Sequence, residues 1–559
     1  MIIKLNTFKG QNKMYPAYAM PIELGQQAVN TYIENGTLKP MFGDTTFDLP
    51  VGTTVPRNTK TVYKHKNINT AETEWHFFTD QRTIVRHPVG TDTLQRIYYI
   101  SDGKLKVKRF DWPDELDVLM PQPNPQDQLT VAISDGGTGD RSRFIAFSFV
   151  NTFGEESALS LTDSGTGSYQ YGNYYIEGLT EASSITVTWD SETIIPSGGV
   201  YDNNITKIRF YMTPVTTSAD DYRFAGEALI SDENITIENA GTDISISEIV
   251  TSPVRLTYND YDTVSLLGVC KTSFGSIITW DAGNIYVSDM KHPYIFSALS
   301  TYSIESEILS VNSFGNSFLV TTTTNPFVLT GTDPTAMLTE KAEQARGCLN
   351  KDCIVDMGNF ICVPTDEGIY KIGTGTFELA TKDMFSLNSW KDVIANGSYL
   401  NTATQYKNLY LLNLTTGVTL VFDFINNFFW ELDYNVVYGY YDALEQLLYY
   451  NPDDTSKETL SVFNNDTETV KEYSFKTGKV MLNAPVNFKY VRVYADDYDG
   501  TITLKAYDTG VLKITRTITT DDIVKLPSIK FNEVELEIIS DRVINFVNVS
   551  TTMEEILGA

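Results

Sequence analysis

Short runs in which apolar and polar residues alternate recur along most of the chain, with turn residues between them. Alternation with a period of two places every second side chain on one face of a β-strand. Residues 501–507 (TITLKAY) and 534–539 (VELEII) alternate cleanly, and 144–150 (FIAFSFV) alternates more loosely. Helical periodicity is nearly absent, and its best candidate is a turn or two at 342–346. The pattern predicts an all-β protein.

One form of strand start repeats at a nearly constant interval. Five times between residues 284 and 449 a short polar turn leads into an apolar-aromatic strand start, and the successive aromatic residues lie 41, 43, 40 and 39 residues apart. These residues are Tyr286, Phe327, Tyr370, Tyr410 and Tyr449. An interval of about 40 residues is the length of a four-stranded blade of a β-propeller. Any all-β protein can space some aromatic strands regularly, but four similar intervals in succession favour a propeller.

Composition changes along the chain and predicts separate domains. Segment 121–255 opens with PQPNP, closes near Pro253, and carries 19 acidic and 6 basic residues. Its strand at 144–150 runs into the turn 151–158 (NTFGEESA), which resembles a fibronectin type III or immunoglobulin-like sandwich. We expect an acidic sandwich inserted in a propeller loop, because surface loops tolerate insertion.

The full expected organisation has five parts. They are an N-terminal β platform segment at 1–60, a first blade region at 61–120 with its strand start at 96–103, the inserted domain at 121–255, the remaining blades at 256–483, and a C-terminal β-sandwich or platform at 484–559 that packs with the N-terminal segment. At 559 residues the chain is too long for a single ordinary core, so several domains are expected.

The formal net charge of −29 argues against two classes of binding partner. Ordinary nucleic-acid binders use Lys and Arg to displace counterions from phosphates, so this charge argues against them. It also disfavours binding to an anionic membrane surface. A conduit for DNA stays compatible, because a channel should repel DNA weakly rather than hold it. We expect no secretory signal and no membrane span, since no apolar run reaches the roughly 18 residues that a span needs.

Histidine, the side chain most used for acid–base catalysis at neutral pH, is rare in this chain. None of the four histidines stands at a recognised spacing from Ser, Cys or Asp, and we interpret them as ordinary surface or core residues. They are His65, His76, His87 and His292. We therefore predict no enzyme, no catalytic, cofactor-binding or metal-ligating residue, and no cofactor.

The four cysteines match neither a CxxC zinc pattern nor a redox motif. They are Cys270, Cys348, Cys353 and Cys362, and the last three have four and eight residues between them. Free cysteines are usually buried and behave as small apolar residues. We predict buried or half-buried free thiols made in a reducing cytosol.

Three other segments have superficial likenesses to functional motifs. The turn 280–284 (WDAGN) is only reminiscent of the repeated S-x-D-x-G-x-x-W turn of sialidase-type propellers. Segment 496–500 (DDYDG) suggests a calcium loop, but Ala495 and Ala506 then occupy its first and twelfth positions, where oxygen ligands are needed. Segment 372–376 (IGTGT) is glycine-rich but has no following helix to bind phosphate. We predict turns at all three.

Several motifs follow one another in a recognisable order. Segment 266–268 (LLG) precedes 285–289 (IYVSD) and 292–294 (HPY), and 322–337 (TTTNPFVLTGTDPTAM) comes next. Further members are Gln344, 347–348 (GC), 356–358 (DMG) and 365–370 (TDEGIY). The series resembles the tail nozzle proteins of short-tailed bacteriophages, whose T-x-x-x-P-Y-x-L-x-G-x-D-P-x-x-M stretch has Tyr where this chain has Phe327. Segments 26–30 (QQAVN), 34–40 (ENGTLKP) and 151–157 are similar to that family's opening segment and inserted sandwich. The likeness covers about half of the chain.

The resemblance implies a virion structural protein that forms a hexameric ring at the distal end of a short tail. Such a ring would attach to a tail adaptor ring, contact tail fibres or spikes, and let double-stranded DNA pass without sequence-specific binding. It would be made in the host cytoplasm and end in the virion tail. Two alternatives stay open: a surface adhesin or glycan-binding propeller, and a polysaccharide depolymerase.

Overall fold

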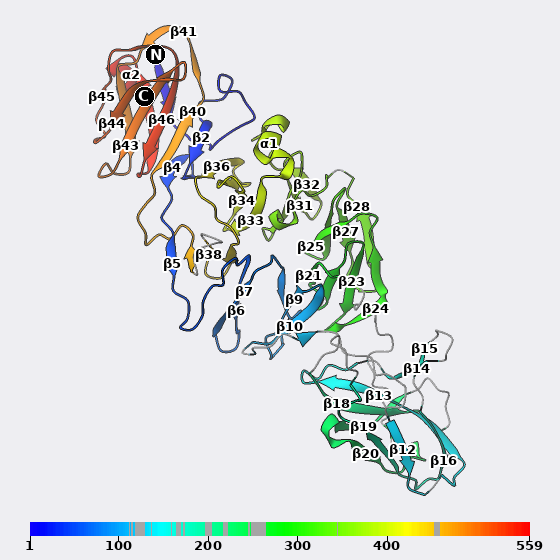
Figure 1. Ribbon diagram of the computed structural model, residues 1–559. Coiled ribbons are helices and arrows are strands. Elements are labelled where there is room, and N and C mark those ends of the chain that lie inside the picture. Colours follow the sequence, from blue (N-terminus) through cyan, green and yellow to red (C-terminus); the bar gives the residue numbers. More distant parts are fainter. Residues whose placement is uncertain are drawn as a thin grey trace. The chain divides into compact units, whose positions relative to one another are not determined.

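Antiparallel strands account for most of the structure, which is a computed structural model of the chain (Figure 1). It describes residues 1–110, 112, 116–117, 129–135, 137–157, 159–163, 169–171, 174–195, 204–215, 222–243, 246, 264–343, 345–451 and 459–558. The chain forms two compact units, the first made of Met1–Arg82, Leu319–Val328 and Lys341–Ala559, and the second of Thr83–Phe318 and Leu329–Glu340. The PQPNP segment and Pro253 lie outside the described residues.

Four-stranded antiparallel sheets of the propeller-blade type recur in both units. Three consecutive sheets are coloured green to yellow-green in Figure 1. They are β21 (Gly268–Lys271), β22 (Ile277–Trp280), β23 (Asn284–Asp289) and β24 (His292–Ser303); β25 (Ile308–Phe314), β26 (Ser317–Thr322), β27 (Phe327–Thr330) and β28 (Leu338–Lys341); and β29 (Val355–Asp356), β30 (Ile361–Pro364), β31 (Ile369–Gly373) and β32 (Thr376–Leu379).

Two more sheets of this type, and one four-stranded part of a larger sheet, complete the series. The two sheets are β8 (Ile84–Arg86), β9 (Ile97–Ser101), β10 (Lys104–Lys108) and β11 (Leu116–Asp117); and β37 (Tyr440–Asp442), β38 (Leu447–Tyr450), β39 (Leu460–Val462) and β5 (Thr45–Phe47). The four-stranded part is β33 (Leu400–Tyr406), β34 (Leu409–Leu414), β35 (Thr419–Asp423) and β36 (Phe428–Leu432), which continues through β2 into a ten-stranded sheet. The early strand β5 thus completes a sheet whose other strands come some 400 residues later in the chain: Leu460 pairs with Phe47. The predicted all-β, propeller-type fold is confirmed.

The five repeated aromatic residues all lie on inner strands of these sheets and are all buried. Tyr286, Phe327 and Tyr370 lie on the third strand of their sheets, whereas Tyr410 and Tyr449 lie on the second. The constant interval therefore marks buried inner strands rather than one fixed position in a blade.

The predicted sandwich is present in the second unit, as a three-stranded and a four-stranded sheet. Its strands are β12 (Leu129–Ile133), β17 (Ile185–Trp189) and β20 (Asn234–Ile237) in one sheet, β16 (Tyr174–Leu179), β13 (Arg141–Asn151), β18 (Ile205–Met212) and β19 (Arg223–Leu229) in the other, and the separate pair β14 (Leu161–Asp163) and β15 (Tyr169–Tyr171). Apolar residues of both sheets share one core, in which Trp189 packs on Phe210 with ring centroids 5.6 Å apart.

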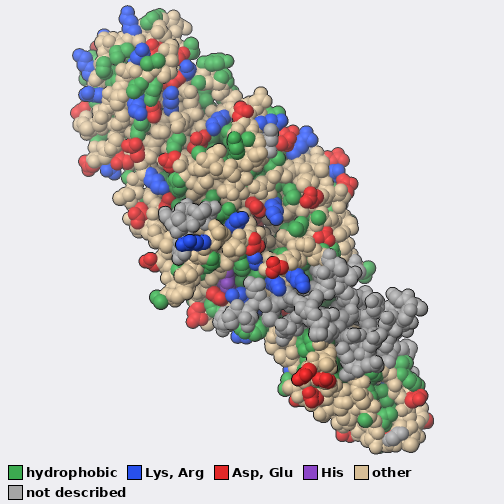
Figure 2. Space-filling view, in the orientation of Figure 1, with side chains coloured by type: hydrophobic (Ala, Val, Ile, Leu, Met, Phe, Trp, Pro, Cys, Tyr) green, Lys and Arg blue, Asp and Glu red, His purple; other side chains and the backbone are tan. Residues whose placement is uncertain are grey.

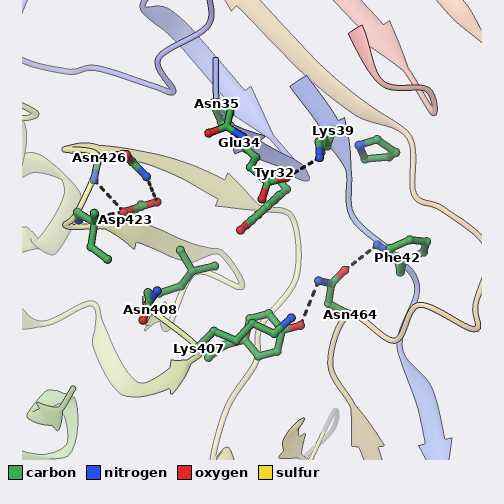
Figure 3. Close-up of a pocket in the computed structure, with 15 residues that line it drawn as sticks. Tyr32, Glu34, Asn35, Lys39, Phe42, Lys407, Asn408, Asp423, Asn426 and Asn464 are labelled. Atoms are coloured by element: carbon green, nitrogen blue, oxygen red, sulfur yellow. Dashed lines mark hydrogen bonds and ion pairs between the residues drawn. The ribbon is translucent and has the colours of Figure 1, made fainter. Parts of the chain in front are cut away.

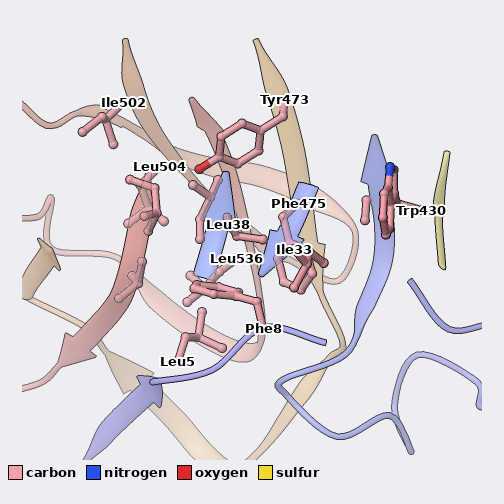
Figure 4. Close-up of a cluster of buried hydrophobic side chains, with 14 of the residues drawn as sticks. Leu5, Phe8, Ile33, Leu38, Trp430, Tyr473, Phe475, Ile502, Leu504 and Leu536 are labelled. Carbon is pink, nitrogen blue, oxygen red and sulfur yellow. The ribbon is translucent and has the colours of Figure 1, made fainter. Parts of the chain in front are cut away.

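The C-terminal sandwich incorporates N-terminal strands. One sheet contains β1 (Ile2–Leu5), β3 (Thr31–Glu34), β4 (Thr37–Pro40), β42 (Tyr490–Ala495), β45 (Val524–Lys525) and β47 (Ile544–Ser550), and the other contains β2 (Gly25–Val29), β40 (Tyr473–Thr477), β41 (Val480–Asn487), β43 (Ile502–Asp508), β44 (Val511–Thr517) and β46 (Lys530–Ser540). The shared core includes Leu5, Phe8, Ile33, Phe475 and Leu536 (Figure 4).

Three details differ from the sequence-based expectations. Residues 61–78 form a separate hairpin, β6 (Thr61–Lys66) and β7 (Thr73–Phe78), and the first four-stranded sheet begins only at Ile84. Strands of the C-terminal sandwich begin at Tyr473, before residue 484. The expected helical turn at 342–346 is not helical where it is described.

Helices are few and short in the described part of the chain. They are α1 (Leu387–Ile394), α2 (Met553–Leu557) and the 3₁₀ turns η1 (Ile230–Asp232), η4 (Lys351–Cys353) and η5 (Ala395–Gly397). The Ser386 hydroxyl caps α1 by accepting the backbone N–H of Ser389 at 3.1 Å, and the helix buries Trp390 and Ile394. Among the described helices, none has the length and apolar character needed to cross a membrane.

Candidate functional site

A pocket of about 580 Å³ lies beside the β3–β4 hairpin and the turns of the β33–β36 sheet (Figure 3). On the hairpin side, the Lys39 ammonium pairs with the Glu34 carboxylate at 2.5 Å. Tyr32 packs edge-on against Trp430 with ring centroids 5.9 Å apart, and burial raises the pKa of the Tyr32 hydroxyl. This wall offers one ion pair and one protonated phenol.

The rest of the lining is largely polar, and hydrogen bonds hold it in place. The Asp423 carboxylate accepts backbone N–H bonds from Ile425 and Asn426 at 2.9 and 3.0 Å, and the Asn426 amide at 2.8 Å. Asn464 accepts the Phe42 backbone N–H at 2.7 Å and donates to the Tyr406 hydroxyl at 3.4 Å. The fifteen lining residues include neither His nor Cys. Amides, carboxylates and aromatic rings suit hydrogen bonding to a hydroxyl-rich ligand better than nucleophilic chemistry.

A buried charged network ties the sandwich to the β8–β11 sheet within the second unit. The Arg96 guanidinium contacts Glu155 at 2.5 Å and Asp92 at 3.2 Å, and it lies 5.1 Å from the centroid of the Phe153 ring. Asn151 donates to the second Glu155 oxygen at 3.0 Å. Asn151, Phe153 and Glu155 belong to the predicted NTFGEESA turn, so this turn makes the contact between the two parts.

Burial and charge act in opposite directions on the carboxylates of this network. Burial raises the pKa of Glu155 despite the neighbouring Arg96. Burial alone would also raise the pKa of Asp92, but hydrogen bonds and charge from Arg96 lower it. An ionised, hydrogen-bonded arrangement this deeply buried has a structural role, since removing one partner would leave a charge without compensation.

The structure distributes the four histidines over three environments. His65 and His76 are 1% and 6% exposed and lie together on the β6–β7 hairpin, and one ligand atom of each lies within 4.8 Å of a Glu74 carboxylate oxygen. His87 is buried beside Arg96, while His292 is exposed and contacts Asp289 at 3.1 Å. Sequence reasoning missed the grouping of His65, Glu74 and His76. The sequence feature that could have revealed this group is the spacing of two histidines on facing strands of a short hairpin.

The predicted burial of the four free cysteines is confirmed. Burial raises the pKa of the Cys348 thiol to about 12, and it raises the pKa values of Cys353 and Cys362 well above their usual value. Because the thiolate is the reactive form, these three thiols are poor nucleophiles at neutral pH.

The three segments with superficial motif likenesses lie in turns. Asp281 accepts the backbone N–H groups of Gly283 and Asn284 at 2.7 and 2.6 Å and the Tyr286 hydroxyl at 2.6 Å, which closes the β22–β23 turn. Segment 372–376 forms the β31–β32 hairpin, and 496–500 connects β42 to β43.

The segment 322–337 forms tight connections around strand β27. The Thr322 hydroxyl donates to the Asn325 carbonyl at 2.8 Å, and Asn325 donates to the Ala345 carbonyl at 2.7 Å. Gly331 has φ +152°, and a Cβ there would lie 3.1 Å from the Met337 Cα, so glycine fits this position best. Gln344 of the motif series lies outside the described residues.

No protein-family model matches this chain, and no curated protein matches it either. Solved structures give weak overall matches. A computationally designed protein, Ika8, is 9% identical with a TM-score of 0.29 over 83% of this chain and 99% of its own. Apo AztD from Citrobacter koseri is 9% identical with a TM-score of 0.26 over 71% and 99% of the two chains, and the N-terminal domain of Nup159 is 10% identical with 0.21 over 76% and 98%. The fold assignment rests on the strand pairing described above.

Proposed function

We propose that this chain is the tail nozzle of a short-tailed bacteriophage, a structural subunit of a hexameric ring through which double-stranded DNA is retained and then ejected. The observation that carries the proposal is the order of the resembling segments along the chain. Segment 26–40 contributes to β2–β4, 151–157 begins at the last residue of β13, and the stretch from 266 to 370 runs through β21–β31. These segments form strands and tight turns, as expected of a protein whose task is shape.

Charge also supports a conduit. The chain carries a formal charge of −29, and on the face shown in Figure 2 the Asp and Glu side chains are interspersed with Lys and Arg. Repulsion between exposed acidic groups and DNA acts over about 8 Å at physiological salt, the Debye length. An acidic channel wall would therefore keep DNA from adhering without blocking its passage.

The alternative of a glycan-binding surface protein is favoured by one observation, the polar and aromatic pocket beside Tyr32 and Asp423. Tyrosine rings and amide groups are typical components of sites that recognise polar ligands. The depolymerase alternative would in addition require two carboxylates across a cleft. A glycan array separates these alternatives from the nozzle.

Mass photometry of the purified full chain, alone and with the adaptor protein of the same virus, tests the proposal. We expect a discrete particle near six times the 62.7 kDa chain mass, or a complex of that ring with the adaptor ring. Mass spectrometry of purified virions should detect the chain. A chain that stays monomeric with and without adaptor, is absent from virions, and binds a defined glycan would overturn the proposal in favour of the glycan-binding alternative.

A further inference from the structure

The β6–β7 hairpin places two histidines and a glutamate on one face. His65 pairs directly with Glu74, and Tyr63 pairs directly with His76. Since side chains alternate along a strand, the four residues of these two pairs share a face, while Lys64 lies on the other. The rings of His65 and His76 have centroids 5.6 Å apart at an interplanar angle of 41°.

The opposite face of the hairpin is anchored within the first unit. The Lys64 ammonium pairs with Asp442 at 3.1 Å and with Glu445 at 2.5 Å. Trp75 packs against Phe47 and Tyr449, with ring centroids 5.5 and 5.0 Å away. These contacts fix the two backbone strands, so only side-chain rotations are needed to bring the three potential ligands around an ion.

The separation of the three ligand groups is close to that of a metal site. One ligand atom from each of His65, Glu74 and His76 lies within 4.8 Å of the other two, and the nearest His76 nitrogen and Glu74 oxygen are 3.7 Å apart. Tetrahedral zinc with bonds of roughly 2.0–2.1 Å needs ligand atoms about 3.4 Å apart. A modest rotation of side chains closes this gap, and Glu74 has the freedom for it because its side chain is 31% exposed.

We propose that His65, Glu74 and His76 bind a zinc-class divalent ion. Two imidazoles and one carboxylate are a donor set that suits Zn²⁺ and its transition-metal neighbours, whereas Ca²⁺ and Mg²⁺ prefer oxygen ligands. Water reaching the site past Glu74 supplies the fourth ligand. The ion would cross-link β6 to β7, which matters because a two-stranded sheet is only marginally stable by itself.

A different arrangement elsewhere in the chain provides a matched comparison. His292 and Asp289 also form a histidine–carboxylate pair, at 3.1 Å, but they are exposed and the pair has a single imidazole. If the hairpin groups only formed an ordinary ion pair, the hairpin and the His292–Asp289 pair would bind a metal ion equally well. If the hairpin is a metal site, the ion should bind there, and the His292–Asp289 pair should not contribute to binding.

Calorimetric titration of the metal-stripped, tag-free full chain with ZnCl₂ tests the proposal, with Co²⁺ absorption as a second readout. We expect one ion per chain and the visible bands of four-coordinate Co²⁺. Glu74→Gln keeps the side-chain shape at a partly exposed position and should weaken Zn²⁺ binding roughly 10–100-fold or more, since even indirect partners of a metal have effects of that size. His292→Gln should leave both readouts unchanged.

Melting temperatures distinguish a variant that loses metal binding from a variant that fails to fold. Added Zn²⁺ should raise it in the wild-type chain and in His292→Gln, because an ion that binds only the folded state stabilises that state. It should raise it much less in Glu74→Gln, whose circular dichroism should match the wild type. A folded wild-type chain that takes up no Zn²⁺ or Co²⁺, or binding that is equal in Glu74→Gln, would overturn the assignment.

Discussion

The C-terminal sandwich is attached to strands β33–β36, and the inserted sandwich to the β8–β11 sheet, by contrasting interactions. Strand β2 pairs with β36 at Val29 and Glu431 and with β40 on its other side, so one continuous sheet leads from the β33–β36 sheet into the C-terminal sandwich. The inserted sandwich meets the β8–β11 sheet through Arg96 and Glu155, two buried charges.

The two attachments should respond differently to changes in pH and to substitutions. Backbone pairing and apolar burial do not depend on proton uptake near neutral pH. The stability that a buried ion pair contributes depends on the protonation of both partners. When one partner is lost, the charge that stays buried destabilises the folded chain. The first attachment should therefore be sensitive to lost volume, and the second to lost charge and to pH.

The largest expected effect comes from removing volume at the continuous sheet. Trp430 on β36 is fully buried in the shared core and packs on Tyr32. Trp430→Ala should lower the free energy of unfolding by about 3–5 kcal/mol, the usual cost of such a cavity. Calorimetry of the full chain checks this, with Leu444→Ala as control because Leu444 is 84% exposed. Equal effects of the two changes would contradict the apolar attachment.

The next effect concerns the charged attachment. Arg96→Met leaves Glu155 buried without its partner and should destabilise the second unit by about 3 kcal/mol. Adding Glu155→Gln to Arg96→Met removes the uncompensated charge and should recover a large part of the loss. A double-mutant cycle measured by urea unfolding gives the coupling between the two residues. If the effects of the two changes simply add, the pair does not join the insert to the sheet.

Much of this fold could be predicted from the sequence because its signals are local. Alternation within 501–507 reflects strand β43, in which every second side chain is buried, and alternation within 534–539 reflects β46, whose apolar face at Val534, Leu536 and Ile538 is buried. The aromatic interval identified inner strands, although Tyr410 occupies a different strand position from Tyr370. Helix α1 escaped notice because eight residues give too short a stretch to establish a helical period.

The interactions at the candidate sites could not be predicted, because they join residues that are distant in sequence. Arg96 and Glu155 are 59 residues apart, and the pairing of β5 with β39 connects residues more than 400 apart. Only His65, Glu74 and His76 are close enough in sequence for a hairpin register to have suggested them. A hairpin was not predicted there, because 61–120 was interpreted as one blade.

The smallest expected effect is a pH dependence in the charged attachment, and it comes from His87. Burial lowers the pKa of this ring from 6.5 to about 4, helped by the nearby Arg96 and Lys271 and opposed by Asp92. Between these two values the unfolded chain binds a proton that the folded chain does not, so stability is fully present above pH 6.5 and falls as the pH drops towards 4.

Partial solvent screening limits this contribution of His87 to about 2 kcal/mol. His87→Gln should remove it, so the melting temperature of the variant should fall less than that of the wild type between pH 7 and pH 4. The raised pKa of Glu155 acts in the opposite direction, but it is present in both proteins and cancels in the difference. Thermal melts across this range measure it, and parallel curves would mean that His87 is protonated equally in the folded and unfolded states.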